Sequence, residues 1–245
     1  MSFITQKIYL LFIFPFIFFG ILIDISSFVL NKIKFIYNKL NLKEGIMKGR
    51  IVLYSLIRNI ILITSCHILF HVKYENLEIL DKYNKCLICP NHSRIFDPAF
   101  LYPKVENMYS VAKSELFKNK LIAKFLTYHN AFPIERNKTD IKGAKSILEQ
   151  LENQEKIRLL IFPEGGIFKE NYKYNKRKTK SGAVYLSAIA NVPIIPVHIT
   201  VRPKFFSTVT VTFGDAIFPD KAVLKNKKLL KENATKLINQ IYDIN

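Results

Sequence analysis

Short apolar runs alternate with amphipathic stretches along the chain after about Val72, a pattern typical of an α/β fold. The amphipathic stretches predict helices that start at Ser114, Thr139 and Ser181, followed by a lysine-rich C-terminal helix over residues 224–242. The apolar runs predict strands at residues 72–75, 85–89, 108–112, 131–134, 157–162, 194–200 and 209–213. The pattern therefore predicts an α/β fold, with a central mixed β-sheet flanked by helices in one domain over residues 72–245.

The first 71 residues have a different pattern. Residues 8–23 form an unbroken apolar run that contains Pro15. A helix needs about 20 apolar residues to cross a bilayer, so this run suits a kinked span or a shallow insertion. Residues 51–70 predict a second helix, amphipathic or re-entrant, that lies at the membrane interface. We therefore expect residues 1–71 to form a membrane-associated helical segment, although a buried core helix also explains the first run.

The chain is strongly basic, with 37 lysine and arginine residues against 19 acidic residues and a formal net charge of +18. Such a charge favours a polyanionic partner, either nucleic acid or an anionic membrane surface. The apolar N-terminal segment favours the membrane over nucleic acid. We therefore expect an anionic membrane surface and no nucleic acid as partner, at the cytoplasmic face of the cell membrane.

The chemistry begins at His92 and Asp97, which stand five positions apart in the segment NHSRIFDP. On a regular helix this spacing places two side chains on different faces, so the pair needs a bend in order to meet. The bend is supplied by a strand that ends near Pro90 and a helix for which Asp97 is the expected N-cap, with Pro98 after it. A histidine held by a carboxylate on one ring nitrogen can accept a proton on the other, as a general base does. Taken alone, the pair is also explained by a helix cap and a turn histidine.

Three further blocks follow along the chain. The first, AFPIER, ends a predicted strand with Arg136, whose guanidinium can bind a phosphate through two hydrogen bonds. The second, LIFPEGG, leads a buried strand into Glu164, Gly165 and Gly166, where glycine amides can approach a ligand closely. The third, VPIIPV, is an apolar strand bracketed by prolines.

In this order, the blocks resemble the glycerolipid acyltransferase family typified by 1-acylglycerol-3-phosphate acyltransferase, over residues 72–218. NHSRIFD matches the family's His-x-x-x-x-Asp catalytic motif, FPEG matches its third motif, and VAKSEL resembles its second strand-to-helix turn. The resemblance implies an enzyme that transfers a fatty acyl group from acyl-CoA or acyl carrier protein to the free hydroxyl of a lysophospholipid. The expected acceptor is 1-acylglycerol-3-phosphate, which gives phosphatidate.

The resemblance also implies a role for each site residue. His92 is the expected general base on the acceptor hydroxyl, and Asp97 orients it. Lys113 and Arg136 are assigned to the acceptor phosphate, although a solvated lysine and a surface salt bridge also explain them. The substrate pocket is expected to be shaped by Glu164, Gly165 and Gly166.

Two departures from the family pattern leave the acceptor open. The third motif usually continues Glu-Gly-Thr-Arg, whereas Gly166 and Ile167 follow here, so a common phosphate-binding arginine is missing. Arg177, Lys178 or Lys180 are alternative sources of that charge. In the motif that contains AFPIER, Asn130 stands where the family often has a glycine. Asparagine tolerates the left-handed backbone conformation that glycine allows.

Two other functions stay open for this chain. One is the same chemistry on another lysolipid, a glycolipid or an aminolipid. The other is a non-catalytic, membrane-bound protein that binds lipid or nucleic acid. We expect no cofactor and no metal, because the sequence has neither a dinucleotide-binding fingerprint nor a plausible ligand cluster. Cys86 and Cys89 are expected to be reduced and to point to opposite faces of one strand.

Overall fold

The structure is a computed structural model that describes residues 70–94, 97–135, 140–167, 179–201 and 203–244. The expected membrane-associated segment, residues 1–71, lies almost entirely outside the described residues, so it and its boundary with the α/β domain stay predictions. Among the described residues, no helix combines the length and the apolar character that crossing a bilayer requires.

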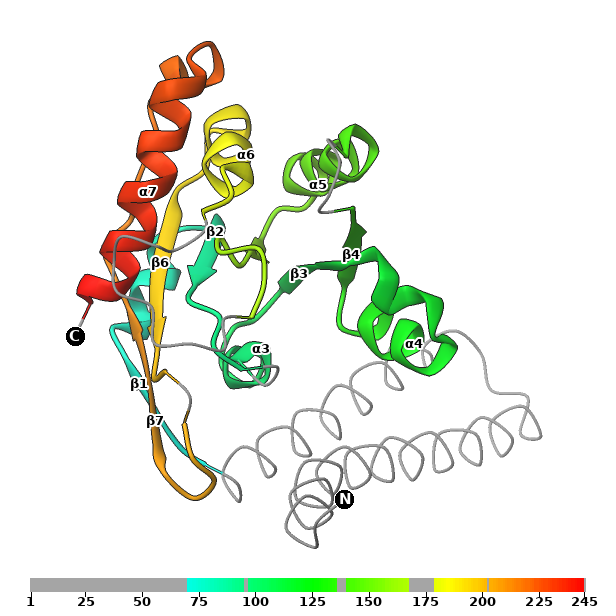
Figure 1. Cartoon of the computed structure of the whole chain (residues 1–245), viewed down its shortest axis with the longest axis vertical. Coiled ribbons are helices and arrows are strands. Elements are labelled where there is room, and N and C mark those ends of the chain that lie inside the picture. Colours follow the sequence, from blue (N-terminus) through cyan, green and yellow to red (C-terminus); the bar gives the residue numbers. More distant parts are fainter. Residues whose placement is uncertain (1–69, 95–96, 136–139, 168–178, 202, 245) are drawn as a thin grey trace, which may run out of the picture. The chain divides into compact units, whose positions relative to one another are not determined.

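The described residues form a seven-stranded sheet with the order β1-β7-β6-β2-β5-β3-β4 (Figure 1). The strands β6, β2, β5, β3 and β4 run parallel, whereas β7 is antiparallel to β6 and parallel to β1. Their bounds are β1 His71–Glu75, β2 Lys85–Pro90, β3 Met108–Lys113, β4 Ala131–Ile134, β5 Ile157–Leu160, β6 Ile194–Ile199 and β7 Thr208–Phe213. The predicted strands and the predicted mixed sheet are confirmed, with small differences at the strand ends.

Helices cover both faces of this sheet. The helices α5 (Ile141–Asn153), α6 (Gly182–Ala190) and α7 (Lys227–Asp243) pack on one face. The 3-10 helix η1 (Leu77–Lys82) and the short α3 (Asp97–Leu101) pack on the other. The 3-10 helix η2 (Ser114–Lys118) and α4 (Lys120–Tyr128) follow β3, and η4 (Lys221–Leu224) precedes α7.

The starts of two α-helices differ from the sequence prediction. Ser114 caps no helix, because it is the first residue of η2, and α4 begins separately at Lys120. The cap of α5 is Asp140 rather than Thr139, since its carboxylate accepts a hydrogen bond from the Gly143 N–H at 2.8 Å. Hydrogen bonds from the backbone amides of Glu135 and Gly143 hold the pKa of Asp140 below its usual value.

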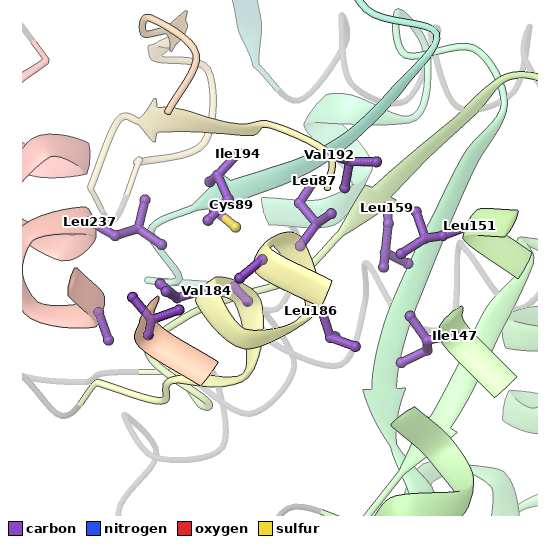
Figure 2. Packing of buried hydrophobic residues seen from close by; sticks show 14 of the residues in the cluster. Leu87, Cys89, Ile147, Leu151, Leu159, Val184, Leu186, Val192, Ile194 and Leu237 are labelled. Atoms are coloured by element: carbon purple, nitrogen blue, oxygen red, sulfur yellow. The ribbon is translucent and has the colours of Figure 1, made fainter. Parts of the chain in front are cut away.

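Apolar side chains bury both faces of the central strands. On the face covered by α5, α6 and α7, Leu87 and Cys89 of β2 pack with helix residues such as Leu186 (Figure 2). On the other face, Cys86 and Ile88 pack with the residues around α3. The two cysteines therefore point to opposite faces, as predicted, and both are free thiols. Burial raises the pKa of Cys86 to about 12 and raises that of Cys89 as well.

Asn91 fixes the point at which the chain leaves the sheet after β2. Its buried side chain donates from Nδ2 to the carbonyl of Ile199 at 2.9 Å and accepts at Oδ1 from the Ile199 N–H at 2.7 Å. The Asn91 N–H also donates to the Val197 carbonyl at 3.4 Å. A side-chain amide thus extends the backbone hydrogen bonding between β2 and β6 by one more pair. The next residue, His92, starts from a fixed position.

We expect Asn91→Leu to lower the free energy of unfolding by about 2 kcal/mol or more. The substitution keeps the size of the side chain but leaves the buried N–H and carbonyl of Ile199 unpaired, each at roughly 1–3 kcal/mol. Asn233→Leu on α7 is the matched control, because Asn233 donates only to a carbonyl of its own helix, that of Leu229. Urea denaturation measures both variants, and equal stability of the two would contradict the anchoring role of Asn91.

Candidate active site

One oxygen of Asp97 closes the turn that follows Asn91. The Oδ2 atom lies 3.0 Å from His92 Nδ1, and it accepts hydrogen bonds from the backbone N–H groups of Ser93 at 2.6 Å and Arg94 at 2.8 Å. Asp97 is fully buried and His92 is almost so. The bend that the five-residue spacing requires is therefore present, and the predicted pairing of the two side chains is found in the structure.

Asp97 is not the predicted N-cap of the following helix, because its carboxylate binds amides that precede the helix. Asp97 is the first residue of α3, and its carboxylate turns back toward the amides of Ser93 and Arg94. These two amides belong to the loop before the helix. The carboxylate therefore organises the histidine loop, and α3 serves as the support that carries it.

The hydrogen bonding defines which nitrogen of His92 is available. Nδ1 of His92 faces Asp97 Oδ2, and a neutral imidazole that donates from Nδ1 to the carboxylate keeps a lone pair on Nε2. A histidine in this tautomer, with its ring orientation held by a buried acid, can take a proton at Nε2. This geometry is one that a general base paired with an orienting carboxylate requires.

Phe162, from the loop after β5, packs directly on the imidazole. The ring centroids of His92 and Phe162 are 3.9 Å apart with an interplanar angle of 24°. The contact follows from the register, because β2 and β5 are parallel neighbours in which Ile88 pairs with Leu160, so both loops leave the same edge of the sheet. The FPEG motif is thus joined to the histidine motif by a side-chain contact that one-dimensional spacing does not reveal.

Glu164, two residues beyond Phe162, is buried. Its Oε1 accepts a hydrogen bond of 2.6 Å from the hydroxyl of Tyr242, near the C-terminal end of α7. Tyr242 was not expected at the site, and nothing in the lysine-rich pattern of α7 distinguishes it. Glu164 therefore has a structural partner in addition to its predicted place beside the substrate.

The glycine turn after Glu164 has a left-handed backbone at Gly165, where φ is 72°. The Gly165 N–H donates to the Phe162 carbonyl, and the Lys180 N–H donates to the Pro163 carbonyl. The stem of Lys180 lies over Gly165, because a Cβ at that glycine would stand 2.8 Å from Lys180 Cγ. Among the residues that the structure describes, no atom would lie within 4 Å of a Cβ at Gly166.

Of the two predicted phosphate-binding residues, the structure describes Lys113 but not Arg136. Lys113 ends β3 at the same edge of the sheet, and its Nζ forms an ion pair of 3.1 Å with Glu115. This pair is about half exposed, and the Lys113 ammonium contributes to lowering the pKa of Glu115, after a backbone hydrogen bond within Glu115 itself. Arg136 lies outside the described residues, so its assignment stays a prediction.

Asn130 adopts φ of 52°, so the prediction that it replaces glycine in a left-handed position is confirmed. Within the ranges that the structure describes, no three histidine, cysteine or acidic side chains are grouped closely enough to hold a metal ion.

We expect Gly165→Ala to lower the free energy of unfolding by roughly 1–2 kcal/mol, because a Cβ is strained in the left-handed conformation. The new methyl group also meets the stem of Lys180. Gly166→Ala is the matched control and should be neutral to slightly stabilising, since no described atom would lie within 4 Å of its Cβ. Thermal and urea unfolding measure both. A Gly165→Ala protein as stable as the Gly166→Ala protein would contradict the described turn.

Comparison with known proteins places the chain in a family. Residues 71–200 match the model of the family described as Acyltransferase. A 1-acyl-sn-glycerol-3-phosphate acyltransferase of Streptococcus pneumoniae is 24% identical over 164 residues, which cover 65% of this chain and 59% of that protein. The enzyme of the same name from Bacillus subtilis is 30% identical over 127 residues, which cover 51% of this chain and 60% of the relative. The chain thus spans about 60% of the length of these two curated relatives.

A solved structure shows the same fold. The 1-acyl-sn-glycerophosphate (LPA) acyltransferase PlsC of Thermotoga maritima aligns with a TM-score of 0.66 at 16% identity, covering 98% of this chain and 97% of that chain. The residues that the family model matches include the His92–Asp97 turn and the FPEGG turn. Because the family model matches more than half of the 245 residues, the chain belongs to the acyltransferase family, as its motifs predict.

Proposed function

We propose that the protein transfers a fatty acyl group from an acyl thioester to the free hydroxyl of a lysophospholipid. The proposed acceptor is 1-acylglycerol-3-phosphate, and the product is then phosphatidate. The observation that carries the proposal is the buried His92–Asp97 pair, held at the end of β2 with Phe162 stacked on the imidazole. The names of the curated relatives support the choice of acceptor.

The proposed chemistry is a direct transfer with His92 as general base. Nε2 of His92 removes the proton of the acceptor hydroxyl, the resulting oxygen nucleophile attacks the thioester carbonyl, and Asp97 stabilises the imidazolium that forms. The C–S bond then breaks, and the thiolate takes the proton back from His92. Burial keeps Cys86 and Cys89 protonated by raising the pKa of each, so neither offers a thiolate for a covalent intermediate.

The developing negative charge on the thioester oxygen requires a hydrogen-bond donor. The N–H of Gly165 already donates to the Phe162 carbonyl. Gly166 is on the same turn, and no described atom would lie within 4 Å of a Cβ there. This turn follows β5, the strand next to β2, which leads to His92. We therefore assign the N–H of Gly166 as the donor to this oxygen, with Glu164 and Gly165 shaping the turn that presents it.

The phosphate of the acceptor requires cations. Arg136 and Lys113 are the assigned residues, and the Lys113–Glu115 ion pair would have to open or rearrange for Lys113 to take part. The arginine that the third motif usually carries is missing here. Lys180 is the described residue of the following basic stretch, and its stem already lies over Gly165. We therefore assign Lys180 as a further cation for the acceptor phosphate, in place of the missing arginine of the third motif.

We propose that the acceptor reaches the site from an anionic membrane surface, at the cytoplasmic face of the cell membrane. The apolar run at residues 8–23 and the net charge of +18 support this location. The donor, either acyl-CoA or acyl carrier protein, then arrives from the aqueous side. A panel of lysolipids offered with each donor, with the products identified by mass spectrometry, tests the donor and the acceptor together.

We expect His92→Ala to lower the turnover of acyl transfer by roughly 100-fold or more, because it removes the general base. His71→Ala is the matched control, since His71 is an exposed residue at the start of β1 and should retain full turnover. Purified proteins are assayed with acyl-CoA and 1-acylglycerol-3-phosphate. Retention of most activity in His92→Ala would remove this residue as the base and would contradict the proposed function.

We expect Arg136→Ala to raise the apparent KM for 1-acylglycerol-3-phosphate by roughly tenfold or more, because a charge-assisted hydrogen bond contributes roughly 1.5–3 kcal/mol. Lys180→Ala should act in the same direction, whereas the KM for the acyl donor should change little in both variants. Lys142→Ala, an exposed position on α5, is the control for a general loss of positive charge. An acceptor KM equal to that of the control would refute the phosphate assignment.

A further inference from the structure

The loop between β6 and β7 carries exposed apolar side chains. The structure describes its residues 200–201 and 203–207. Val201 is 44% exposed and Phe206 is 69% exposed, the latter with φ of 63°. A left-handed conformation is uncommon for a bulky residue and persists only where the surroundings hold it, so such a residue points to a function. Here the backbone presents an aromatic ring to the outside.

This loop leaves the sheet at the same edge as the candidate active site. β6 and β2 are parallel, and the side chain of Asn91 binds both backbone groups of Ile199, the last residue of β6. His92 therefore lies two residues beyond the end of β2, and the loop starts one residue beyond the end of β6. In Figure 1 the turn between β6 and β7 lies at the end of the sheet where α3 is found.

The inner side of the loop is fastened to the active-site helix by aromatic rings. Phe205 contacts Phe70 with ring centroids 5.6 Å apart, and Phe70 contacts Phe100 of α3 edge to face at 5.1 Å. Phe100 is buried, and Asp97 is the first residue of the same helix. The loop thus has a packed root next to the site, while Phe206 remains on the outside.

We propose that the β6–β7 loop is a lipid-contacting element, with Phe206 inserted at the boundary between headgroups and acyl chains. An aromatic ring beside an exposed cation, here Lys204, suits the surface of an anionic bilayer. The inference rests on the proposed function, in which the acceptor is a membrane lipid whose hydroxyl must reach His92. An apolar loop at this edge brings the bilayer to the site and shortens the path of the acceptor.

Tryptophan fluorescence tests this contact, because the chain contains no tryptophan. The full-length Phe206→Trp protein is reconstituted into vesicles of phosphatidylglycerol and phosphatidylcholine, with and without brominated acyl chains. We expect its emission to shift to shorter wavelength in vesicles and to be quenched by the brominated lipids. Val201→Trp provides a second reporter on the same loop, with the same expected result.

Phe218→Trp is the matched control. Phe218 is 61% exposed, but it follows the end of β7, which runs antiparallel to β6, and its ring lies 5.9 Å from that of Tyr83 just before β2. It therefore marks the opposite edge of the sheet. Its tryptophan should keep a solvent-exposed emission and escape quenching in the same vesicles.

The outcomes separate this inference from the proposed function. Solvent-like, unquenched emission from both loop reporters would overturn the inference, as would equal quenching at Phe218→Trp. A blue shift that appears without lipid and grows with protein concentration would mean a contact between proteins and would also overturn it. The measurement needs no turnover, so quenching at the loop in a protein that transfers no acyl group would count against the proposed function alone.

Discussion

The site depends on a single carboxylate oxygen that accepts three hydrogen bonds. Oδ2 of Asp97 receives the ring N–H of His92 and the backbone N–H groups of Ser93 and Arg94, in a position with no solvent exposure. A buried carboxylate is tolerated only where such donors surround it. The amides of the turn therefore stabilise the Asp97 carboxylate, and the carboxylate in turn holds the ring of His92. Removal of any one donor would destabilise the buried carboxylate further, because its Oδ1 has no hydrogen-bond partner among the described residues.

The parallel sheet makes this turn part of a larger site. Because β2, β5 and β6 run in the same direction, their carboxyl ends meet at one edge, where loops of α/β proteins bind ligands. Asn91 ties the histidine loop to β6, and Phe162 brings the loop after β5 onto the imidazole. Two neighbouring strands thus restrain His92 from both sides. The apolar core behind them supplies rigidity, since close packing limits how far these strand ends can shift.

The strands and the pairing of His92 with Asp97 were predictable from local pattern, whereas the contacts between distant residues were not. Apolar runs mark the strands because each central strand is buried on both faces, and Asn130 was recognisable because few residues accept its backbone conformation. Spacing in one dimension carries no information about Asn91 with Ile199 or Glu164 with Tyr242, whose partners lie 108 and 78 residues apart. The cap predicted at Ser114 failed for a related reason. Local propensity favoured it, but the chain there forms a 3-10 turn after β3 instead.

The glycine turn has two unusual features, the positive φ of Gly165 and the close approach of the Lys180 stem. Gly165 requires the absence of a side chain because its φ is positive and because the stem of Lys180 occupies the place of a Cβ. The Lys180 backbone is held there by its hydrogen bond to the Pro163 carbonyl, so the lysine follows the turn rather than moving independently of it. A flexible ammonium on a fixed stem provides the same charge as the missing arginine but lacks its planar, bidentate geometry. The Lys180 ammonium would therefore attract a phosphate by charge without fixing its orientation.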